Sequence, residues 1–160
     1  MERVVILGRG RAGKSTAAAE LGRITGLPVV ELDAHFWDSD LVPLPVDEWV
    51  RRQQALAAAP VWIMDGDLGP YDAPAARLAR ADPVLVLDFS LVRCAWRAAR
   101  RSRERWDFWW WLLTWRSRSR PAVLREVPVH AIGAAVHVVR APRELQTLLL
   151  AAKTRHSQAE

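Results

Sequence analysis

The chain has 160 residues, of which 51% are hydrophobic and 26% charged, and its formal net charge is +5. This length and apolar fraction suit one domain with a core of ordinary size. The single cysteine, Cys94, excludes an internal disulfide, and no Cys/His spacing is typical of a zinc site. We therefore expect a protein of a reducing, cytoplasmic compartment.

The apolar run at the beginning of the chain, Val4 to Leu7, is too short for a signal peptide or a membrane span. The later run from Phe108 to Trp115 is also too short to cross a bilayer. Residues 153–160 are polar and lack periodicity, so we expect a domain over 1–152 and a flexible tail over 153–160.

Positive charge is concentrated in residues 93–125, where two acids, Glu104 and Asp107, accompany ten arginines. These are Arg93, Arg97, Arg100, Arg101, Arg103, Arg105, Arg116, Arg118, Arg120 and Arg125. Such a segment suits a nucleic-acid backbone or a local anionic ligand equally well, so the basic count does not choose between them.

Five short apolar runs, largely β-branched, are bounded by turn residues. They are Val4–Leu7, Val29–Leu32, Val61–Met64, Val84–Leu87 and Val136–Val139. Alanine- and leucine-rich segments with helical patterns separate them: 14–24, 47–58, 72–81, 90–105, a Trp-rich stretch from Trp106, and 142–152. Alternating strands and helices predict an α/β fold in three layers, a five-stranded parallel sheet with helices on both faces.

Residues 8–16 are GRGRAGKST and match the Walker A pattern between an expected strand and an expected helix. In that context the backbone amides and the helix N-terminus surround phosphate oxygens. Lys14 would reach the β and γ phosphates of ATP, and the Ser15 hydroxyl would ligate Mg²⁺. The expected nucleotide-binding residues of this loop are Gly8, Gly10, Ala12, Gly13, Lys14, Ser15 and Thr16. The alternative is a glycine-rich turn that binds nothing.

Acidic residues follow three of the expected strands: Asp33, Asp65 and Asp88. Ligands of open α/β sheets bind outside the carboxyl ends of the strands. Phosphoryl transfer needs one carboxylate near Mg²⁺ and another that orients or deprotonates the acceptor, and Asp65 and Asp33 could divide that work. The alternative for each is a helix cap or turn residue, most plausibly for Asp88. Asp67 is a further candidate for contact with the acceptor.

Several motifs together resemble the P-loop kinases of the adenylate kinase-like group, most closely the proteins known as DNA topology modulation proteins or adenylate kinase-like ATPases. The matching pieces are GRGRAGKST, GLPVVELDAHFW (26–37), VWIMDGDL (61–68), DPVLVLDFSLVRCAWRAARR (82–101), RSRSRPAVL (116–124) and VHVVRAPREL (136–145). They span nearly the whole chain, and the second and third are more diagnostic than the Walker motif alone.

On the acceptor side, the resemblance implies that Asp33 lies at the acceptor site beside His35, Phe36 and Trp37. It also implies that Asp65 is the Asp-Gly carboxylate near Mg²⁺.

The resemblance also implies an arginine-bearing lid around 93–120. Arg97 and Arg101 would flank this lid, and Arg116 and Arg120 would follow it. The loop at Arg140 and Pro142 would lie beside the donor base.

The chain departs from this family in two places on the acceptor side. It has Asp-Gly-Asp-Leu at 65–68 instead of Asp-Gly-Asn-Tyr, with Tyr71 displaced by three residues, and its lid segment 102–115 has no Gly or Pro. In the phosphate loop, Arg9 and Arg11 occupy positions where resembling proteins more often carry small residues. We expect Arg9 to face solvent and leave Arg11 open between solvent and an anionic acceptor.

The stretch RWDFWWWLLTWRSRSR (105–120) combines five tryptophans with four arginines. A helix would place Trp106, Trp109 and Trp110 on one face and Trp111 and Trp115 on another. Four interpretations compete: core packing against the sheet, a shortened lid or acceptor contact, a homodimer interface, and contact with a membrane or nucleic acid. The flanking arginines suit phosphates, because their planar fork binds oxygens in pairs.

The leading hypothesis is a P-loop kinase that transfers the γ-phosphoryl group of Mg-ATP to a small acceptor such as a nucleotide. Lys14, Asp33 and the lid arginines Arg97, Arg101, Arg116 and Arg120 would be catalytic, and Ser15 and Asp65 would hold Mg²⁺. The alternative is a nucleotide-dependent ATPase or regulator that contacts nucleic acid. A third possibility is a protein that binds nucleotide without turning it over.

Overall fold

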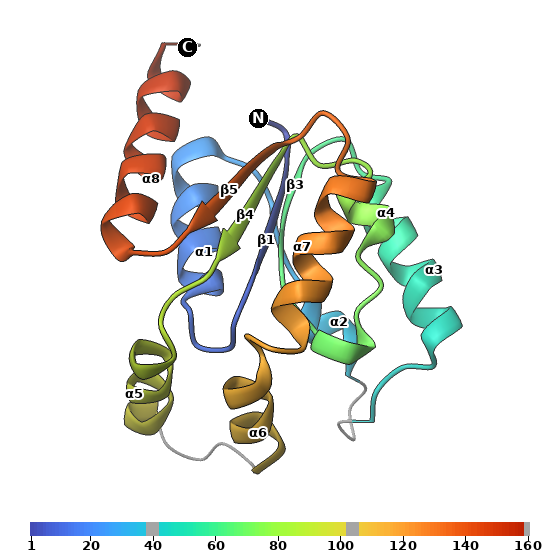
Figure 1. Ribbon diagram of the computed structural model, residues 1–160. Helices are drawn as coiled ribbons and strands as arrows, with labels where there is room; N and C mark the ends of the chain where they lie inside the picture. Colours follow the sequence, from blue (N-terminus) through green and yellow to red (C-terminus); the bar gives the residue numbers. More distant parts are fainter. Residues whose placement is uncertain (38–41, 102–105, 159–160) are drawn as a thin grey trace.

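The computed structural model describes residues 1–37, 42–101 and 106–158 (Figure 1). In chain order the elements are β1 (Arg3–Gly8), α1 (Lys14–Thr25), β2 (Val29–Glu31), α2 (Leu32–Phe36), α3 (Val46–Ala57), β3 (Trp62–Asp65), the 3-10 turn η1 (Gly69–Tyr71), α4 (Ala75–Leu78), β4 (Pro83–Leu87), α5 (Leu91–Arg101), α6 (Trp106–Thr114), α7 (Ser119–His130), β5 (Ala135–Val139) and α8 (Pro142–Ser157). The sequence predicts all five strands close to these bounds.

The sheet has the strand order β2-β3-β1-β4-β5, and every neighbouring pair is parallel. At its centre β1 pairs Ile6 with Asp65 of β3 and Gly8 with Leu87 of β4. Because parallel strands end at the same edge, the loops that follow β1, β3 and β4 meet there. The segments α2, α5 and α6 also lie at this edge, below the sheet in Figure 1.

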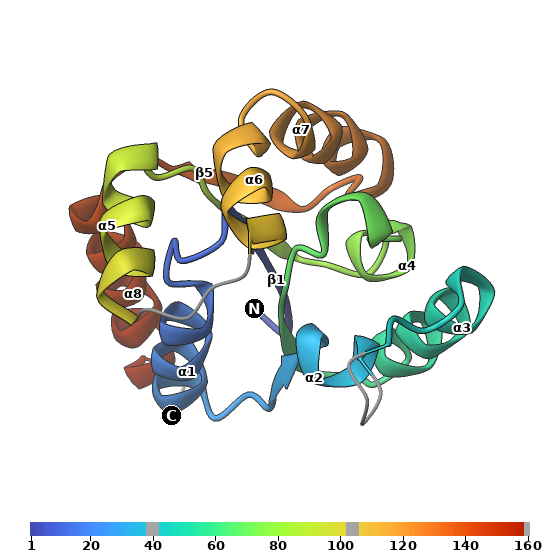
Figure 2. The same cartoon turned by 90° about the horizontal axis from the view of Figure 1, so that it is seen from below.

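Successive residues of β1 are buried on opposite faces of the sheet, which is why its apolar run is continuous. Val4 and Ile6 pack on the face that α1 and α8 cover. Val5 and Leu7 pack on the opposite face, against residues of α3, α4 and α7. Figure 2 shows these two helical layers on either side of the sheet. The α/β fold class in three layers is confirmed.

The prediction of one helix over residues 72–81 is wrong. Only Ala75–Leu78 form a helix, and the 3-10 turn Gly69–Tyr71 precedes it. Pro70 and Pro74 lack the N–H groups that a longer helix would use, so the chain turns twice instead. Asp72 is thereby left outside the helix, where its carboxylate accepts hydrogen bonds from Arg77.

Two helices differ from the expectation: the sequence predicts no helix over 119–130, where α7 lies, and α8 extends beyond residue 152. Pro121 and Pro128 argue against a helix in the segment that forms α7. Pro121, however, lies in the first turn, where a missing N–H costs nothing. The expected tail is wrong for residues 153–157, because α8 continues to Ser157. Arg155 and His156 in its last turn favour this extension, since cationic side chains stabilise the C-terminal end of a helix.

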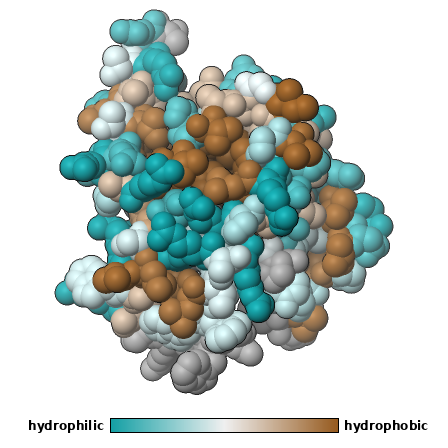
Figure 3. All heavy atoms as spheres, in the orientation of Figure 1, coloured by the Kyte–Doolittle hydropathy of each residue, from teal (hydrophilic) through white to brown (hydrophobic). Residues whose placement is uncertain are grey.

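The outer strand β5 is only partly covered. Figure 3 shows apolar atoms gathered over it, and Val136 on β5 and Ile132 just before it are 43% and 87% exposed. Within the described ranges, no helix is long and apolar enough to cross a bilayer. The polar residues that concern function lie instead at the carboxyl edge of the sheet.

Candidate active site

The phosphate loop connects β1 to α1 through backbone conformations that require glycine. Gly8 has φ 142° and Gly13 has φ 99°, and a Cβ on Gly8 would lie 2.5 Å from the carbonyl oxygen of Leu87. Gly13 is the N-cap of α1 and has no side chain, so no side chain caps the first amides of the helix. Such uncapped amides form a site for an anion, as the sequence predicts for a Walker A loop.

Lys14 lies inside the curve of this loop. Its Nζ donates hydrogen bonds to the carbonyl oxygens of Gly8, at 3.0 Å, and Arg9, at 3.4 Å. The ammonium group is thus held beside the loop amides, where it can reach phosphate oxygens. The next residues, Ser15 and Thr16, are exposed in the first turn of α1.

The last residue of β3, Asp65, lies beside Ser15. The Ser15 hydroxyl lies close enough to the Asp65 carboxylate to lower its pKa as a hydrogen-bond donor. Asp65 is only 4% exposed, and its Oδ1 atom has no hydrogen-bond partner. Burial raises the pKa of Asp65, while Lys14 and the bond from Ser15 lower it. An unpartnered buried carboxylate oxygen beside a hydroxyl fits a hard cation such as Mg²⁺, which prefers oxygen ligands.

This pair is not a complete metal cage. The described part of the chain contains no group of three or more His, Cys, Asp or Glu residues that could hold an ion. Mg²⁺ commonly takes one or two protein ligands and completes its shell with phosphate oxygens and water. Ser15 and Asp65 therefore fit an ion that arrives with a nucleotide.

Asp33 lies in the first turn of α2, directly after β2. The surrounding protein displaces water and raises the pKa of Asp33, although part of its surface is exposed. Lys14 lowers the same pKa, whereas Glu31 and Asp72 raise it. The Asp33 carboxylate and the Lys14 ammonium therefore interact electrostatically at the carboxyl end of the sheet.

The three neighbours of Asp33 that the sequence assigns to the acceptor differ in accessibility. Trp37 is 38% exposed and His35 is half-buried. Phe36 is only 2% exposed and packs edge-on against Trp37 and Trp49. Phe36 thus supports the acceptor side from beneath, and its direct contact with an acceptor stays a prediction.

Asp67 is buried, and both of its carboxylate oxygens have partners within the protein. Oδ1 accepts from the Gly69 amide at 3.0 Å, and Oδ2 accepts from Nε1 of Trp115 at 3.0 Å. Burial raises its pKa, against the effects of Lys14 and of these two donors. The hydrogen bonds of Asp67 therefore connect the loop after β3 to Trp115 at the end of the aromatic segment. The sequence does not predict this connection.

The aromatic helix α6 covers the phosphate loop, as Figure 2 shows from below the sheet. A Cβ on Gly10 would lie 2.4 Å from the Trp111 ring and 2.9 Å from Phe108, and a Cβ on Gly69 would lie 2.7 Å from Trp111 Nε1. Trp111 thus packs between the loops that follow β1 and β3. Its Nε1 is buried without a hydrogen-bond partner.

The expectation that Arg9 faces solvent is wrong, because its side chain is only 1% exposed. Its guanidinium lies 5.2 Å from the centre of the Trp115 ring, and Nη1 donates to the carbonyl oxygen of Phe89 at 3.4 Å. Burial lowers the pKa of Arg9. Arg11 is half-buried at φ 60°, with its guanidinium 5.7 Å from the Phe108 ring. Both arginines therefore contact aromatic rings.

Core packing describes part of the aromatic segment, whereas the lid interpretation stays a prediction. Trp115 and Leu112 are fully buried, whereas Trp110 is 62% exposed. Trp111 and Trp115 both lie against the loops of the site, but α6 ends at Thr114, so the prediction that one helix carries both rings on one face is wrong for Trp115. Trp106 begins α6, but its side chain lies outside the described part.

The lid arginines have different surroundings. Arg97 lies over the phosphate loop, because a Cβ on Gly13 would be 3.0 Å from its Nη1. Arg120 donates from Nε to Oδ2 of Asp88 at 2.8 Å, so Asp88 anchors α7 to the end of β4. Arg116 is exposed, and the Arg101 side chain lies outside the described residues.

At the far end of the site, the loop between β5 and α8 carries Arg140 and Pro142. The Arg140 side chain is exposed, and its backbone N–H donates to Glu144 at 2.7 Å. Pro142 begins α8 as its first residue. This geometry leaves the Arg140 guanidinium at the surface.

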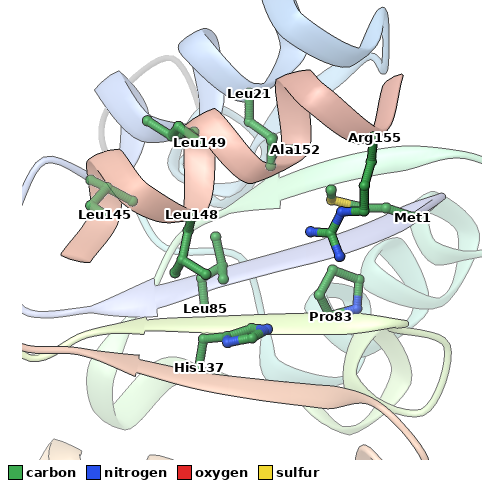
Figure 4. A pocket seen from close by; sticks show the side chains of 10 residues that line it. All are labelled: Met1, Leu21, Pro83, Leu85, His137, Leu145, Leu148, Leu149, Ala152 and Arg155. Carbon is green, nitrogen blue, oxygen red and sulfur yellow. The ribbon is translucent and has the colours of Figure 1, made fainter. Parts of the chain in front are cut away.

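A small cavity lies away from these residues, between α8, α1 and the sheet (Figure 4). Leu148, Leu85 and His137 point toward it, and its volume is about 40 Å³. That volume holds about one water molecule, so the cavity is a packing gap beneath α8.

No family model and no curated protein sequence matches the chain. Solved structures do match it, at low sequence identity. A gluconokinase from Sinorhizobium meliloti 1021 is 20% identical, with a TM-score of 0.57, over 99% of this chain and 94% of that protein. A shikimate kinase from Acinetobacter baumannii, in complex with shikimate, is 14% identical, with a TM-score of 0.58, over 97% and 94%.

A deoxyadenosine kinase from M. mycoides is 16% identical, with a TM-score of 0.58, over 99% of this chain and 100% of that protein. At these identities the likeness shows only that the chain shares its fold with these three kinase structures. A fold alone does not settle which reaction a site performs.

Proposed function

We propose that the protein is an ATP-dependent phosphotransferase that passes the γ-phosphoryl group of Mg-ATP to a small acceptor. The observation that carries this proposal is the group formed by Lys14, Ser15 and Asp65 at the N-terminus of α1. An ammonium, uncapped helix amides and a hydroxyl–carboxylate pair are the parts that phosphoryl transfer requires. Similar folds in gluconokinase and deoxyadenosine kinase structures support it.

In this mechanism the phosphate loop binds the triphosphate through the backbone from Gly8 to Thr16. Lys14 moves its hydrogen bonds from the loop carbonyls to the β and γ phosphates. Ser15 and Asp65 would hold Mg²⁺, which would neutralise phosphate charge. The loop therefore fixes the γ-phosphate at the carboxyl end of β1.

The remaining charged residues act around the transferred group. Asp33 orients the acceptor hydroxyl and accepts its proton, and the raised pKa of Asp33 suits this role. Arg97 neutralises charge that develops on the phosphoryl group, because its guanidinium lies over the loop. Arg101 and Arg116 would add positive charge around this group, whereas Arg120 is already paired with Asp88.

The donor base would lie beside Arg140 and Pro142, in the loop that begins α8. An exposed guanidinium next to a rigid proline ring can stack on a flat aromatic base.

Labelled ATP tests the proposal. Wild type incubated with γ-labelled ATP, Mg²⁺ and a panel of hydroxyl compounds should yield a labelled product. Lys14→Ala should reduce this transfer by roughly 10²-fold or more, because an electrostatic contact to the transition state is lost. The control is Lys153→Ala, which removes the chain's other lysine from the exposed surface of α8 and should change nothing.

Wild type that binds ATP but labels no acceptor would contradict the transferase proposal. The finer resemblance to DNA topology modulation proteins also stays a proposal, with a cytoplasmic location and a homodimer through the aromatic segment. The exposed Trp110 supports the dimer.

A further inference from the structure

Four large apolar side chains are exposed at the end of the molecule that α5 and α6 form. These two helices contact each other below the sheet in Figure 1. Val92 and Trp96 on α5 are 80% and 57% exposed, and Trp110 and Leu113 on α6 are 62% and 55% exposed. We call these four side chains the α5–α6 surface. Exposed apolar side chains that gather at one end of a protein mark a site of interaction.

The α5–α6 surface is separate from the contacts that α6 makes with the phosphate loop. Trp111 lies against Gly10, and Leu112 is fully buried. Trp110 and Leu113 are three residues apart, so they share the exposed face of the helix. One face of α6 thus covers the loop while another face meets the surroundings.

The helix α5 is divided in the same way. Cys94 and Ala98 are buried in the core. Val92, Trp96 and Arg100 follow one another at intervals of four residues, and all three are exposed. The buried face holds α5 on the protein, and the exposed face presents an aliphatic, an aromatic and a cationic side chain together.

Exposed arginines accompany the apolar side chains of this surface. Arg93 and Arg100 lie on α5, and Arg118 lies between α6 and α7. No carboxylate of the described residues forms an ion pair with any of these three. Residues 93–125 contain ten arginines and only two acids. The surface therefore suits a partner that is anionic and also accepts apolar side chains.

The same charge disfavours a second copy of the chain as the partner. A two-fold contact through this surface would bring its arginines close to their own copies. Like charges at short range oppose association. An anionic partner is therefore the better electrostatic match.

Two features favour a lipid surface over a nucleic acid. The Arg100 guanidinium lies 4.0 Å from the centre of the Trp96 ring, so one face of this ring is occupied and closed to a stacking base. Val92 and Leu113 have no ring to stack on a base, whereas both gain free energy when they leave water for hydrocarbon. Tryptophan and arginine side chains suit the boundary between lipid headgroups and acyl chains.

We propose that the α5–α6 surface binds the surface of a membrane that contains anionic phospholipids. The four apolar side chains enter the boundary between headgroups and acyl chains, and the neighbouring arginines bind lipid phosphates. The helix α5 has 11 residues and α6 has 9, so both are too short to span a bilayer and the contact is peripheral. This inference is independent of the phosphotransferase function proposed above.

Vesicle sedimentation with the full chain tests the inference. Vesicles of phosphatidylcholine alone are compared with vesicles in which about 30% of the lipid is phosphatidylserine. The binding constant should be about tenfold higher or more for the anionic vesicles, and it should fall as salt screens the arginines. Equal binding to both kinds of vesicle, or no binding to either, would overturn the inference.

The double variant Trp110→Ser with Leu113→Ser tests the apolar part of the surface. Its binding constant for anionic vesicles should fall by about tenfold or more, because two side chains no longer enter the lipid. Thermal unfolding should stay near wild type, since both side chains are exposed. The matched control is Val129→Ser with Ile132→Ser, which removes two side chains that are 62% and 87% exposed near β5. Equal losses in the two double variants would contradict a specific surface and overturn the inference.

The double variant Arg100→Glu with Arg118→Glu tests the charged part of the surface. Binding to anionic vesicles should weaken by about tenfold or more, because attraction to lipid phosphates becomes repulsion. The matched control is Arg51→Glu with Arg155→Glu, which makes the same change of net charge at exposed positions on α3 and α8. An equal loss in the control would reduce the effect to net charge and overturn the inference.

The two competing partners are measured with the same variants. Sedimentation equilibrium without lipid gives the oligomeric state, and fluorescence anisotropy gives the affinity for labelled single-stranded and duplex DNA. A dimer that dissociates in Trp110→Ser with Leu113→Ser would assign the surface to a second copy of the chain. DNA binding that this variant loses, without a preference of wild type for anionic vesicles, would assign it to nucleic acid. Either result would overturn the inference.

Discussion

The two sides of the phosphate loop differ in the charge of their side chains. On the β4 side, Arg9 and Arg97 lie against the loop, and the rings of α6 cover it. On the β2–β3 side, Asp33 and Asp65 lie at the ends of short strands, with Phe36 and Trp37 close to Asp33 in sequence. A triphosphate carries several negative charges and a hydroxyl carries none. The side with the arginines therefore suits the triphosphate of the donor, and the side with the carboxylates suits the hydroxyl group of the acceptor.

This division also places Lys14 at the boundary. Its ammonium group lies within range of the carboxylates on one side and of Cys94 and its arginines on the other. Both sides are fixed before the reaction. Lys14, which lies between them, can therefore stay beside the phosphoryl group as this group moves from the donor to the acceptor. The contrast between the sides is thus the feature to test by substitution.

The largest effect should come from the anionic side. Asp33→Asn removes the group that accepts the proton, so kcat should fall by roughly 10³-fold while the KM for ATP stays within about twofold. Steady-state kinetics measures both values. The matched control is Asp47→Asn, since Asp47 is an exposed partner of Arg51 on α3. Equal losses in the two variants would remove the catalytic assignment of Asp33.

A smaller effect is expected from the cationic side. Arg97→Gln should lower kcat by about 10²-fold, because its guanidinium lies over Gly13 and opposes developing negative charge. Arg93→Gln, which removes an exposed arginine of the same helix stacked on Phe89, should stay near wild type. If only ATP affinity falls in Arg97→Gln, the residue binds the ground state and not the transition state.

The cover of aromatic rings can be tested through stability. Gly10→Ala places a Cβ 2.4 Å from Trp111, so the free energy of unfolding should fall by about 1–3 kcal/mol. Denaturant titration followed by tryptophan fluorescence measures this change. The double variant Gly10→Ala with Trp111→Ala should lose less than the sum of the single losses, since the clash has gone. Strict additivity would show that the ring does not rest on the loop.

The smallest effect is a difference in pH dependence. Burial raises the pKa of Asp67, so this group holds its proton more tightly in the folded than in the unfolded protein. Wild type should therefore gain stability relative to Asp67→Asn as the pH falls from 7 toward the ordinary Asp pKa of about 4. Urea titrations of both proteins at several pH values give the difference. A difference that does not vary with pH would contradict the raised pKa.

Local sequence patterns are sufficient to predict much of this fold. The five apolar runs predict the strands, and GRGRAGKST between a strand and a helix predicts the phosphate loop. The acids Asp33 and Asp65 were expected at strand ends, which is where they lie. These features depend on neighbours in sequence, so the sequence shows them directly.

Features that depend on distant contacts could not be predicted in the same way. Arg9 is buried because Trp115, more than a hundred residues later, provides a ring for its guanidinium. Arg77 looks like a surface arginine of a helix, yet Asp72 and Gln53 hold it in the core. The sequence does not predict the helix α7, because this segment contains Pro121 and Pro128, yet the folded protein accommodates both prolines in the helix. In each case a tertiary partner decides the outcome.

The position of Trp111 between Gly10 and Gly69 also limits which residues can replace these three during evolution. Either glycine can gain a side chain only when residue 111 becomes smaller, because the indole occupies the space in which both Cβ atoms would lie. The three positions should therefore covary in homologous chains. Position 10 of the phosphate loop can therefore accept a larger residue only in homologous chains that lack the large ring at 111.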